Sequence, residues 1–350
     1  MKIVIVTVYN SENSGSFLQA YALEQVLSSM GHDVRFLRRE LKGTSHKLFG
    51  KLRIKEIVKS VLKANIRDVY ISLRRWYLYE KIIKHFSVCD INSDFYNETT
   101  LFVLGSDTIW NFDDDYFLSK ASLLTGYNLP EKKVITYAAS AANTSEDFFL
   151  KVISKNGNLH NIVEILVRDS HTADLVNKVS SKPAKLVCDP TFLCNPSLYD
   201  SFSAKINISK PYLLLYYGGA IDLSLQNTLK DYAKKNDLDV ISLISYYKWC
   251  TKTYFGAPQY FIPLFKNATA VFTNTFHGCA FSLIYNKRFA VKDDNKNKVT
   301  GLLTEYGVED HLFRSEKDFE NCINIRWREA TSHKMKLKKE ESLKHLSDSL

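Results

Sequence analysis

The 350-residue sequence predicts an α/β fold made of two Rossmann-like units, one after the other. Short apolar runs of strand length alternate with helical patterns along most of the chain. Several of these runs end directly in polar or glycine-bearing loops, as strands of an open parallel sheet do beside a ligand-binding cleft. The alternation begins again near residue 212, and a chain of this length is long enough for two domains of ordinary size.

The first unit opens with a βαβ pattern. Its strand, loop, helix and second strand are predicted at residues 2–8, 10–16, 17–30 and 33–37. The loop contains one glycine, Gly15, and lacks the Gly-x-Gly-x-x-Gly spacing, so the pattern does not indicate a dinucleotide. The side chain of Asn13 can either cap the following helix or bind a polar ligand, and both interpretations stay open.

Residues 42–86 are a basic helical insertion in the first unit. Within 42–85, twelve Lys and Arg residues stand against three acidic ones, an excess that matches the formal net charge of +9 of the whole chain. Apolar residues at helical spacing between the charges predict an amphipathic helix. Such a helix can pack on its own domain or make a peripheral contact with the anionic inner face of the cell membrane. No nucleic-acid-binding module accompanies it, so we expect no nucleic-acid partner.

Four later strands of the first unit end in side chains that could face a cleft. They are predicted at 101–104, 134–139, 162–167 and 185–188, and their exits carry Ser106 with Asp107, Ser140, Arg168 and Asp189. Arg168 could pair with the adjacent Asp169 or bind a phosphate or carboxylate. The acidic run 113–115 could hold a metal, but adjacent acids in a loop are more often solvated. We therefore expect neither a metal nor another cofactor.

A second unit follows the irregular stretch 195–211. Its strand, helix, strand and helix patterns are predicted at residues 212–217, 223–235, 239–244 and 258–266. Residues 326–346 are basic and helical, and they could cross back to the first unit. The predicted division of the chain is therefore 1–205, 206–325 and a C-terminal helix within 326–350.

The stretch 270–291, with strand, turn, short helix and strand patterns, holds the main candidate for catalysis. Thr275 is a helix N-cap type, and His277 lies near the N-terminus of that helix. The positive end of the helix dipole disfavours an imidazolium, so we expect a neutral His277 that can act as acid or base near neutral pH. Gly278 would let an anionic ligand approach the backbone closely. The alternative is a histidine that only hydrogen-bonds its turn.

The composition argues against a secreted or membrane-spanning protein. Six scattered cysteines without a Cys-x-x-Cys pair are typical of reduced thiols rather than of disulfides or a zinc site. The first residues have a strand pattern rather than that of a signal peptide, and no apolar run reaches about 18 residues. We therefore expect a cytoplasmic protein.

Six segments, in order, resemble the polysaccharide pyruvyl transferase family. They are residues 13–15 with 18–23, 105–111, 137–140, 167–169, 188–191, and 273–278 with 280–285. The resemblance implies two Rossmann-like domains facing a central cleft, similar to GT-B glycosyltransferases. It also implies transfer of pyruvyl from phosphoenolpyruvate to two hydroxyls of a glycan sugar, giving a ketal and phosphate in cell-surface polysaccharide biosynthesis. The glycan acceptor could be lipid-linked.

The resemblance also implies roles for residues of this chain. Arg168 matches an arginine that the family uses for the anionic donor, and His277 matches the histidine proposed as its acid or base. Substrate-binding roles are expected for Asn13, Gly15, Ser106, Asp107, Ser140, Thr275 and Gly278. Several members have Arg-Leu-His where this chain has residues 275–277, so a second donor-binding arginine is absent there. Lys287, Arg288 or another lysine could replace it.

Two other functions stay open. A GT-B-type glycosyltransferase would share the architecture and bind the diphosphate of a nucleotide sugar at a helix N-terminus. Against it, no convincing acidic residue follows the His277 turn to bind a ribose, although Asp293 and Asp294 are nearby. An inactive homologue could instead serve as a membrane-associated binding subunit, which the departure at Thr275 and Phe276 would explain.

Overall fold

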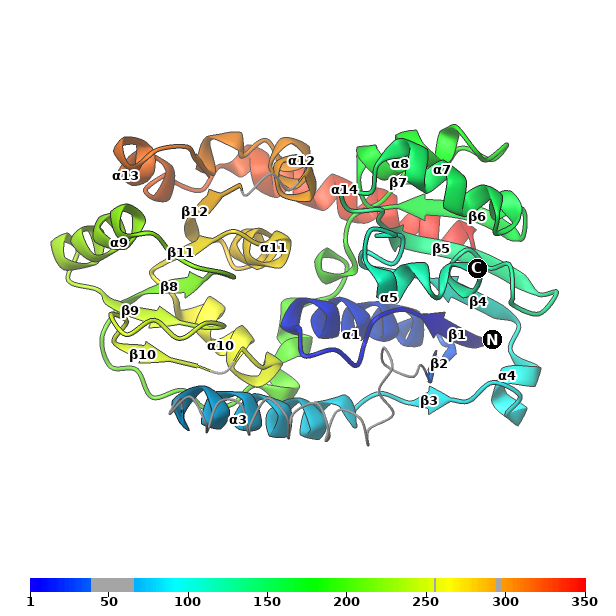
Figure 1. Ribbon diagram of the computed structural model, residues 1–350, viewed down its shortest axis with the longest axis horizontal. Helices are drawn as coiled ribbons and strands as arrows, with labels where there is room; N and C mark the ends of the chain where they lie inside the picture. Colours follow the sequence, from blue (N-terminus) through cyan, green and yellow to red (C-terminus); the bar gives the residue numbers. More distant parts are fainter. Residues whose placement is uncertain (39–65, 255, 294–296) are drawn as a thin grey trace.

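Two parallel β-sheets lie side by side, each surrounded by helices (Figure 1). The computed structural model describes residues 1–38, 66–254, 256–293 and 297–350. This arrangement confirms the predicted α/β fold with two Rossmann-like domains. Residues 42–65 of the basic insertion, and Asp294, lie outside the described residues.

The first sheet has seven described strands, all parallel, in the order β3-β2-β1-β4-β5-β6-β7. Nearly continuous apolar sequences such as KIVIV in β1 and LFVL in β4 suit strands that are buried on both faces. The strands are β1 (Lys2–Val6), β2 (Asp33–Leu37), β3 (Val88–Cys89), β4 (Leu101–Leu104), β5 (Lys133–Ala139), β6 (Ile162–Val167) and β7 (Ala184–Leu186).

The helices of the first domain connect these strands. They are α1 (Ser14–Ser29), α3 (Ile66–Ile83), α4 (Asp94–Glu98), α5 (Asp115–Leu118), α6 (Ala121–Leu124), α7 (Glu146–Ser154) and α8 (Ser170–Asn177), with the 3₁₀ helix η1 (Gly157–Leu159). Asn13 caps α1 by accepting a hydrogen bond from the Gly15 N–H at 2.9 Å. Asp114, from the acidic run 113–115, caps α5 by accepting from the Tyr116 N–H at 2.8 Å. The run therefore starts a helix.

The second sheet repeats this topology. Its six described strands are parallel, in the order β10-β9-β8-β11-β12-β13. They are β8 (Tyr212–Tyr216), β9 (Asp239–Ser242), β10 (Lys252–Thr253), β11 (Ala270–Thr273), β12 (Arg288–Lys292) and β13 (Leu312–Phe313). The helices are α9 (Leu223–Lys235), α10 (Pro258–Asn267), α11 (Phe276–Ile284), α12 (Asn297–Tyr306) and α13 (Phe319–Ile323), with η4 (Glu309–His311) and η5 (Glu316–Asp318).

The two domains share an apolar interface, because one core cluster contains residues of both sheets. The linker between them carries η2 (Pro190–Phe192) and η3 (Pro196–Phe202). Tyr199 of η3 is fully buried and packs against Phe202 and Tyr21 on one side and against Phe281 of α11 on the other. Tyr199 thus links α1 of the first domain to α11 of the second through aromatic contacts.

The C-terminal helix α14 (Glu329–Asp348) runs back along the first domain, in red in Figure 1. Its Ser342 side chain accepts a hydrogen bond from the Cys188 N–H at 2.9 Å. Near the end of the chain, Lys133 Nζ donates to the Leu350 carbonyl at 3.0 Å. Among the described residues, no helix combines the length and apolar composition that crossing a bilayer requires.

Helix α3, the described part of the basic insertion, contacts the second domain. Arg75 Nη2 donates to the Ile244 carbonyl at 2.7 Å, and the Tyr79 hydroxyl donates to the Gly256 carbonyl at 2.8 Å. From the other side, Gln259 Nε2 donates to the Leu78 carbonyl at 3.1 Å. One face of α3 therefore packs on the second domain. The hydrogen bond between the Tyr79 hydroxyl and Ser14 Oγ, at 2.9 Å, also joins α3 to its own domain, as one of the two predicted alternatives required.

Candidate active site

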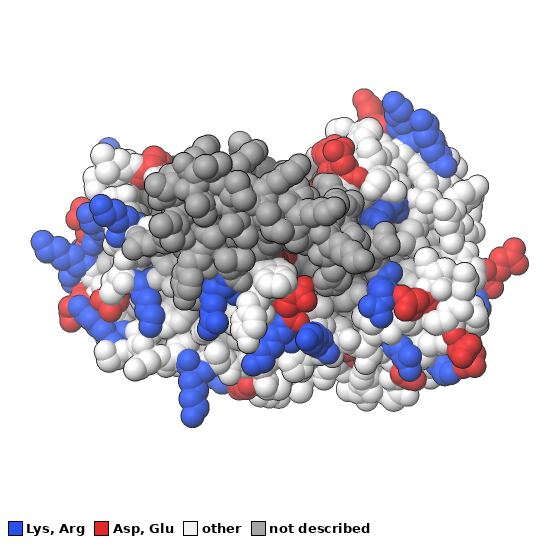
Figure 2. All heavy atoms as spheres, turned by 60° about the horizontal axis from the view of Figure 1, so that its bottom comes forward, with Lys and Arg blue, Asp and Glu red and all other residues white. Residues whose placement is uncertain are grey.

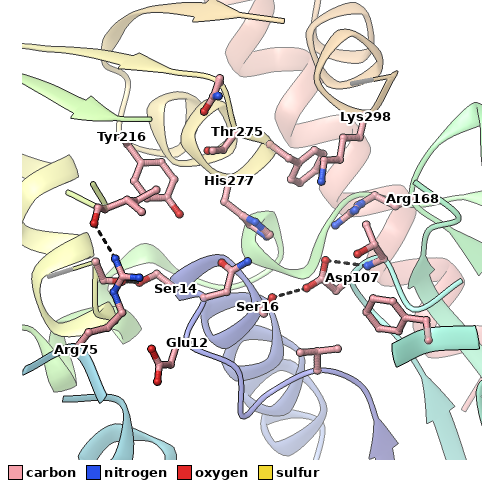
Figure 3. Close-up of a pocket in the computed structure, with 18 residues that line it drawn as sticks. Glu12, Ser14, Ser16, Arg75, Asp107, Arg168, Tyr216, Thr275, His277 and Lys298 are labelled. Atoms are coloured by element: carbon pink, nitrogen blue, oxygen red, sulfur yellow. Dashed lines mark hydrogen bonds between the residues drawn. The ribbon is translucent and has the colours of Figure 1, made fainter. Parts of the chain in front are cut away.

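A cleft of about 410 Å³ lies between the two domains (Figure 3). In each sheet, the strand order reverses between the first strand and its neighbour, at β1 and β4 in one sheet and at β8 and β11 in the other. Ligands of open α/β sheets bind beyond the carboxyl ends of the strands at this switch point. The cleft lies between these two switch points, and α3 and α12 complete its walls.

His277 extends from the first turn of α11 into the cleft (Figure 3). Thr275 caps this helix, because its Oγ1 accepts a hydrogen bond from the Gly278 N–H at 2.9 Å. The imidazole is 11% exposed, and its Nε2 lies 3.9 Å from Asp189 Oδ2. This nitrogen has no hydrogen-bond partner among the described residues. A buried ring nitrogen in this position can exchange a proton with a ligand.

Gly15 determines where the His277 ring can lie. A Cβ at Gly15 would be 2.1 Å from His277 Nδ1, a separation at which one of the two groups must move. The N-terminus of α1 therefore contacts the imidazole directly, and only a glycine allows that approach. Gly15 does not itself line the cleft, but it shapes the position of the residue that does.

Arg168 forms a buried ion pair with Asp189. In Figure 3, Arg168 and Tyr216 of β8 lie on opposite sides of His277. The Nη1 of Arg168 lies 2.9 Å from Asp189 Oδ2, and the two side chains are 3% and 0% exposed. The predicted pairing with the adjacent Asp169 is wrong, because Asp169 Oδ1 instead caps α8 by accepting from the Thr172 N–H at 2.9 Å. The guanidinium lies over the Phe276 ring, 4.3 Å from its centroid. Its Nε has no partner within the described chain.

Burial and charge set the protonation states in the cleft. Burial lowers the pKa of His277 below its ordinary 6.5, although the carboxylates of Asp189 and Asp107 act in the other direction. Burial alone would raise the pKa of Asp107, but Arg168 and His277 bring it below its ordinary value. At neutral pH the cleft therefore holds a neutral imidazole, an ionised Asp107 and a charged Arg168.

The structure brings five of the predicted site residues together. Asn13, Asp107, Arg168, Thr275 and His277 line the same cleft. Asp107 is held in place by the Ser16 hydroxyl, which donates to its Oδ2 at 2.6 Å.

Ser106, Ser140 and Gly278 are not brought into the cleft lining. The Ser106 hydroxyl is fully buried and donates to the Gln19 side chain. Ser140 Oγ accepts from the Ala142 N–H at 3.1 Å. A Cβ at Gly278 would lie 2.0 Å from Thr273 Oγ1, so its small size serves the packing of α11 against β11 rather than contact with a ligand.

Four charged residues of the site were missing from the predicted set: Glu12, Arg75, Asp189 and Lys298. Asp189 was placed at a strand exit, but nothing in the sequence pairs it with Arg168. Lys298 and Arg75 line the cleft from α12 and α3. Neither could be assigned to the site from the sequence. Helical spacing predicts which residues share one face of a helix, but it does not predict which part of the protein that face contacts.

The expected replacements for the missing arginine do not lie in the cleft. Lys287 Nζ donates to the Lys266 carbonyl at 2.6 Å, and Arg288 is likewise absent from the lining. Lys298 is the lysine that the structure places there. Within the described ranges, no group of three or more His, Cys, Asp or Glu side chains is arranged to hold a metal ion.

Comparison with known proteins identifies the family. A model of the family described as polysaccharide pyruvyl transferase matches residues 13–294, which is most of the chain. The protein belongs to the polysaccharide pyruvyl transferase family. All five predicted residues that line the cleft fall within the matched segment. Lys298 lies just beyond it, whereas Arg75 lies inside it. No curated protein sequence matches the chain.

Solved structures share the fold of this family member at low sequence identity. The UDP-GlcNAc 2-epimerase from Methanocaldococcus jannaschii is 11% identical with a TM-score of 0.54, and the match covers 99% of this chain and 98% of that one. The UDP-GlcNAc 2-epimerase from Neisseria meningitidis bound to UDP-GlcNAc is 9% identical with a TM-score of 0.52, and the match covers 100% of this chain and 99% of that one. The glycotransferase of kitacinnamycin is 10% identical with a TM-score of 0.50, and the match covers 98% of this chain and 95% of that one. These likenesses show a GT-B-like fold.

Proposed function

We propose that the protein transfers a pyruvyl group from phosphoenolpyruvate to two hydroxyls of a glycan sugar, forming a cyclic ketal and phosphate in cell-surface polysaccharide biosynthesis. The observation that carries this proposal is the convergence of a neutral histidine and two cations in one interdomain cleft. His277 presents an unpartnered Nε2, and Arg168 and Lys298 lie on one side of it (Figure 3).

Donor binding would use the cationic side of the cleft. Phosphoenolpyruvate carries a phosphate and a carboxylate, and both are acceptors for charge-assisted hydrogen bonds. The Nε of Arg168 has a donor to offer, because it is buried without a partner among the described residues. Lys298 supplies a second positive charge on the same side. The buried pair with Asp189 keeps the guanidinium of Arg168 in one orientation.

The chemical steps need proton transfer at three points. The first hydroxyl loses its proton as its oxygen bonds to C2 of phosphoenolpyruvate, and C3 takes up a proton. The bond from C2 to the phosphate oxygen then breaks, and phosphate leaves with the bonding electrons. The oxygen of the second hydroxyl bonds to C2, which closes the ketal, and the proton that this hydroxyl loses is taken up by the phosphate. A neutral His277 can accept a hydroxyl proton and return it at a later step, a role that contributes roughly 100- to 10,000-fold to rate.

Acceptor hydroxyls would meet the polar side chains around His277. Asp107 is ionised and lines the cleft, so its carboxylate can accept a hydrogen bond from a sugar hydroxyl. Asn13 lines the same cleft. Arg168 would also stabilise the phosphate as its negative charge increases on leaving.

Calorimetric titration tests the donor site. The purified protein is titrated with phosphoenolpyruvate, inorganic phosphate, UDP and GDP. We expect saturable binding of phosphoenolpyruvate that is stronger than that of phosphate and is lost in Arg168→Ala. Binding of a nucleotide diphosphate in place of phosphoenolpyruvate would refute the donor assignment. It would favour a nucleotide-sugar glycosyltransferase, for which the GT-B-like fold is also suited. Binding of none of these ligands would favour an inactive homologue.

The outer face of α3 would give a peripheral contact with an anionic membrane. Trp76 and Tyr77 are 40% and 53% exposed; Lys81 is exposed on the same helix, and Lys84 is exposed directly after its end. Figure 2 turns this side of the molecule forward and shows basic side chains across it, with acidic ones between them. Such a contact would suit a cytoplasmic enzyme with a lipid-linked acceptor. Sedimentation with anionic vesicles should fall in a Trp76→Ala, Tyr77→Ala variant and remain unchanged if the contact does not exist.

A further inference from the structure

The cleft has a second wall, on the other side of His277 from Arg168 and Lys298. Figure 3 shows Arg75 and Tyr216 on this wall, with Glu12 below them. The wall combines a cation, an aromatic ring with a hydroxyl, and a carboxylate. It is chemically distinct from the side that carries Arg168, so it is suited to a different part of the reacting system.

Arg75 is oriented by the second domain. Its Nη2 donates to the Ile244 carbonyl at 2.7 Å, which fixes the plane of the guanidinium. A guanidinium has five N–H donors in a fixed fork, a geometry that matches the oxygens of a carboxylate or a phosphate. The neighbouring Arg74 lies on the outer side of α3, where its guanidinium is 5.6 Å from the centroid of the Tyr77 ring. Two consecutive arginines thus face different spaces.

Tyr216 presents its hydroxyl to the same wall. The residue is 5% exposed, and its ring is held by edge-on contacts with Phe261 and Phe265 at centroid distances of 5.0 and 5.6 Å. Figure 3 shows its hydroxyl directed toward the cleft. A phenolic hydroxyl in this position can donate a hydrogen bond to a polar ligand or accept one from it.

We propose that Arg75, Tyr216 and Glu12 form the acceptor subsite and that they select an acidic sugar. An oxyanion on the sugar, either a carboxylate or a phosphate, would bind Arg75, since a planar fork recognises both. A ring hydroxyl would donate to Glu12, and another would bond to the Tyr216 hydroxyl. This inference rests on the proposed function, because it assigns the second wall to the acceptor. The inserted helix α3 then provides the residue that determines acceptor specificity.

Calorimetric titration of the full-length protein, saturated with phosphoenolpyruvate, tests the subsite. The probes are D-glucuronate, α-D-glucose 1-phosphate, inorganic phosphate and D-glucose. We expect at least one anion to bind at a second site, about tenfold or more tightly than D-glucose. The two acidic sugars separate a carboxylate from a phosphate as the preferred group. Arg75→Gln should abolish the preference for anions, whereas Arg74→Gln, the same change of charge one residue away, should keep it.

Tyr216→Phe is a second variant, because Arg75→Gln also removes the bond to Ile244. Tyr216→Phe keeps the ring packing. It should weaken the binding of acidic sugars about three- to tenfold and leave the binding of inorganic phosphate unchanged.

The inference is overturned if no anion binds beyond the donor site, or if the preference for anions survives Arg75→Gln. Failure to bind phosphoenolpyruvate refutes the proposed function instead. The same anions are then titrated into the protein alone, and the comparison of Arg75→Gln with Arg74→Gln still decides the subsite.

Discussion

Gly15 and His277 belong to different domains, yet a Cβ at Gly15 would lie 2.1 Å from His277 Nδ1. The start of α1 is therefore a backbone surface against which the imidazole rests. This contact keeps Nε2 of the same ring 3.9 Å from Asp189. A glycine at the end of a polar loop thus controls the position of a residue more than 250 positions away in the chain.

Gly15→Ala should displace the His277 ring. An added methyl group in a close-packed site costs about 1–3 kcal/mol of stability, and a shift of roughly 1 Å in a reacting group can slow a reaction about 100-fold. We expect a lower unfolding temperature and phosphate release from phosphoenolpyruvate that is at least about tenfold slower with an acceptor glycan. Nitrogen-15 NMR of the His277 ring reports the displacement without an acceptor.

Gly301→Ala is the matched control. Gly301 lies within α12, and a Cβ there would meet no heavy atom within 4 Å. Replacement of a helical glycine by alanine stabilises by roughly 0.5–1 kcal/mol, so this variant should be slightly more stable and equally active. Equal activity of both variants would show that the contact with Gly15 does not position His277.

The fold was predictable because its signals are local. Buried parallel strands need apolar runs, and runs such as 162–167 and 270–272 coincide with β6 and β11 to within a residue. Helix α9 begins at Leu223 and ends at Lys235, as the pattern indicated. The two Rossmann-like domains follow from this alternation, because parallel strands require helical crossovers.

The site was predictable in part, because the carboxyl ends of parallel strands meet at one edge. Asp107, Arg168 and His277 were found for this reason. Ser106 also follows the end of a predicted strand, but its hydroxyl points inward and donates to the Gln19 side chain. Only the packing of the folded protein decides that direction. Arg75 was missed because an amphipathic helix gives no sign of which residue it turns toward a second domain.

His277→Gln tests the acid or base role. Glutamine retains a polar group of similar size but cannot exchange a proton near neutral pH, so turnover should fall at least about tenfold. His277→Ala should fold and show a similar loss. Binding of phosphoenolpyruvate, measured by calorimetry, should change much less than turnover. Unchanged turnover in both variants would remove His277 from the mechanism.

The pKa of His277 predicts a pH dependence of stability. Burial holds this pKa below 6.5 in the folded protein, whereas the unfolded chain titrates at its ordinary value of about 6.5. As pH falls below about 6.5, the unfolded state binds more protons than the folded state, so the free energy of unfolding decreases. Burial also lowers the pKa of His311, which contributes in the same direction.

Urea unfolding between about pH 5 and 7.5 measures this effect. The stability of His277→Gln should depend less on pH than that of the wild type, and His311 should account for part of the remainder. NMR titration of the folded protein should give His277 a pKa below 6.5. A pKa above 6.5 would mean that the carboxylates of Asp189 and Asp107 outweigh burial, and the slope would then have the opposite sign.

Asp189→Asn tests the buried ion pair. The substitution leaves Arg168 charged and buried without its partner, and breaking such a pair from one side costs about 3–5 kcal/mol. Glu146→Gln is the control, since Glu146 and Lys178 form a surface pair with side chains about half exposed, for which the expected loss is about 0–1 kcal/mol. Urea unfolding of both variants gives the comparison.

Because the Asp189 carboxylate also raises the pKa of His277, Asp189→Asn should lower that pKa further. A stability loss no larger than that of Glu146→Gln would mean that water enters the cleft and screens Arg168. The guanidinium would then bind a donor anion less strongly than its burial indicates.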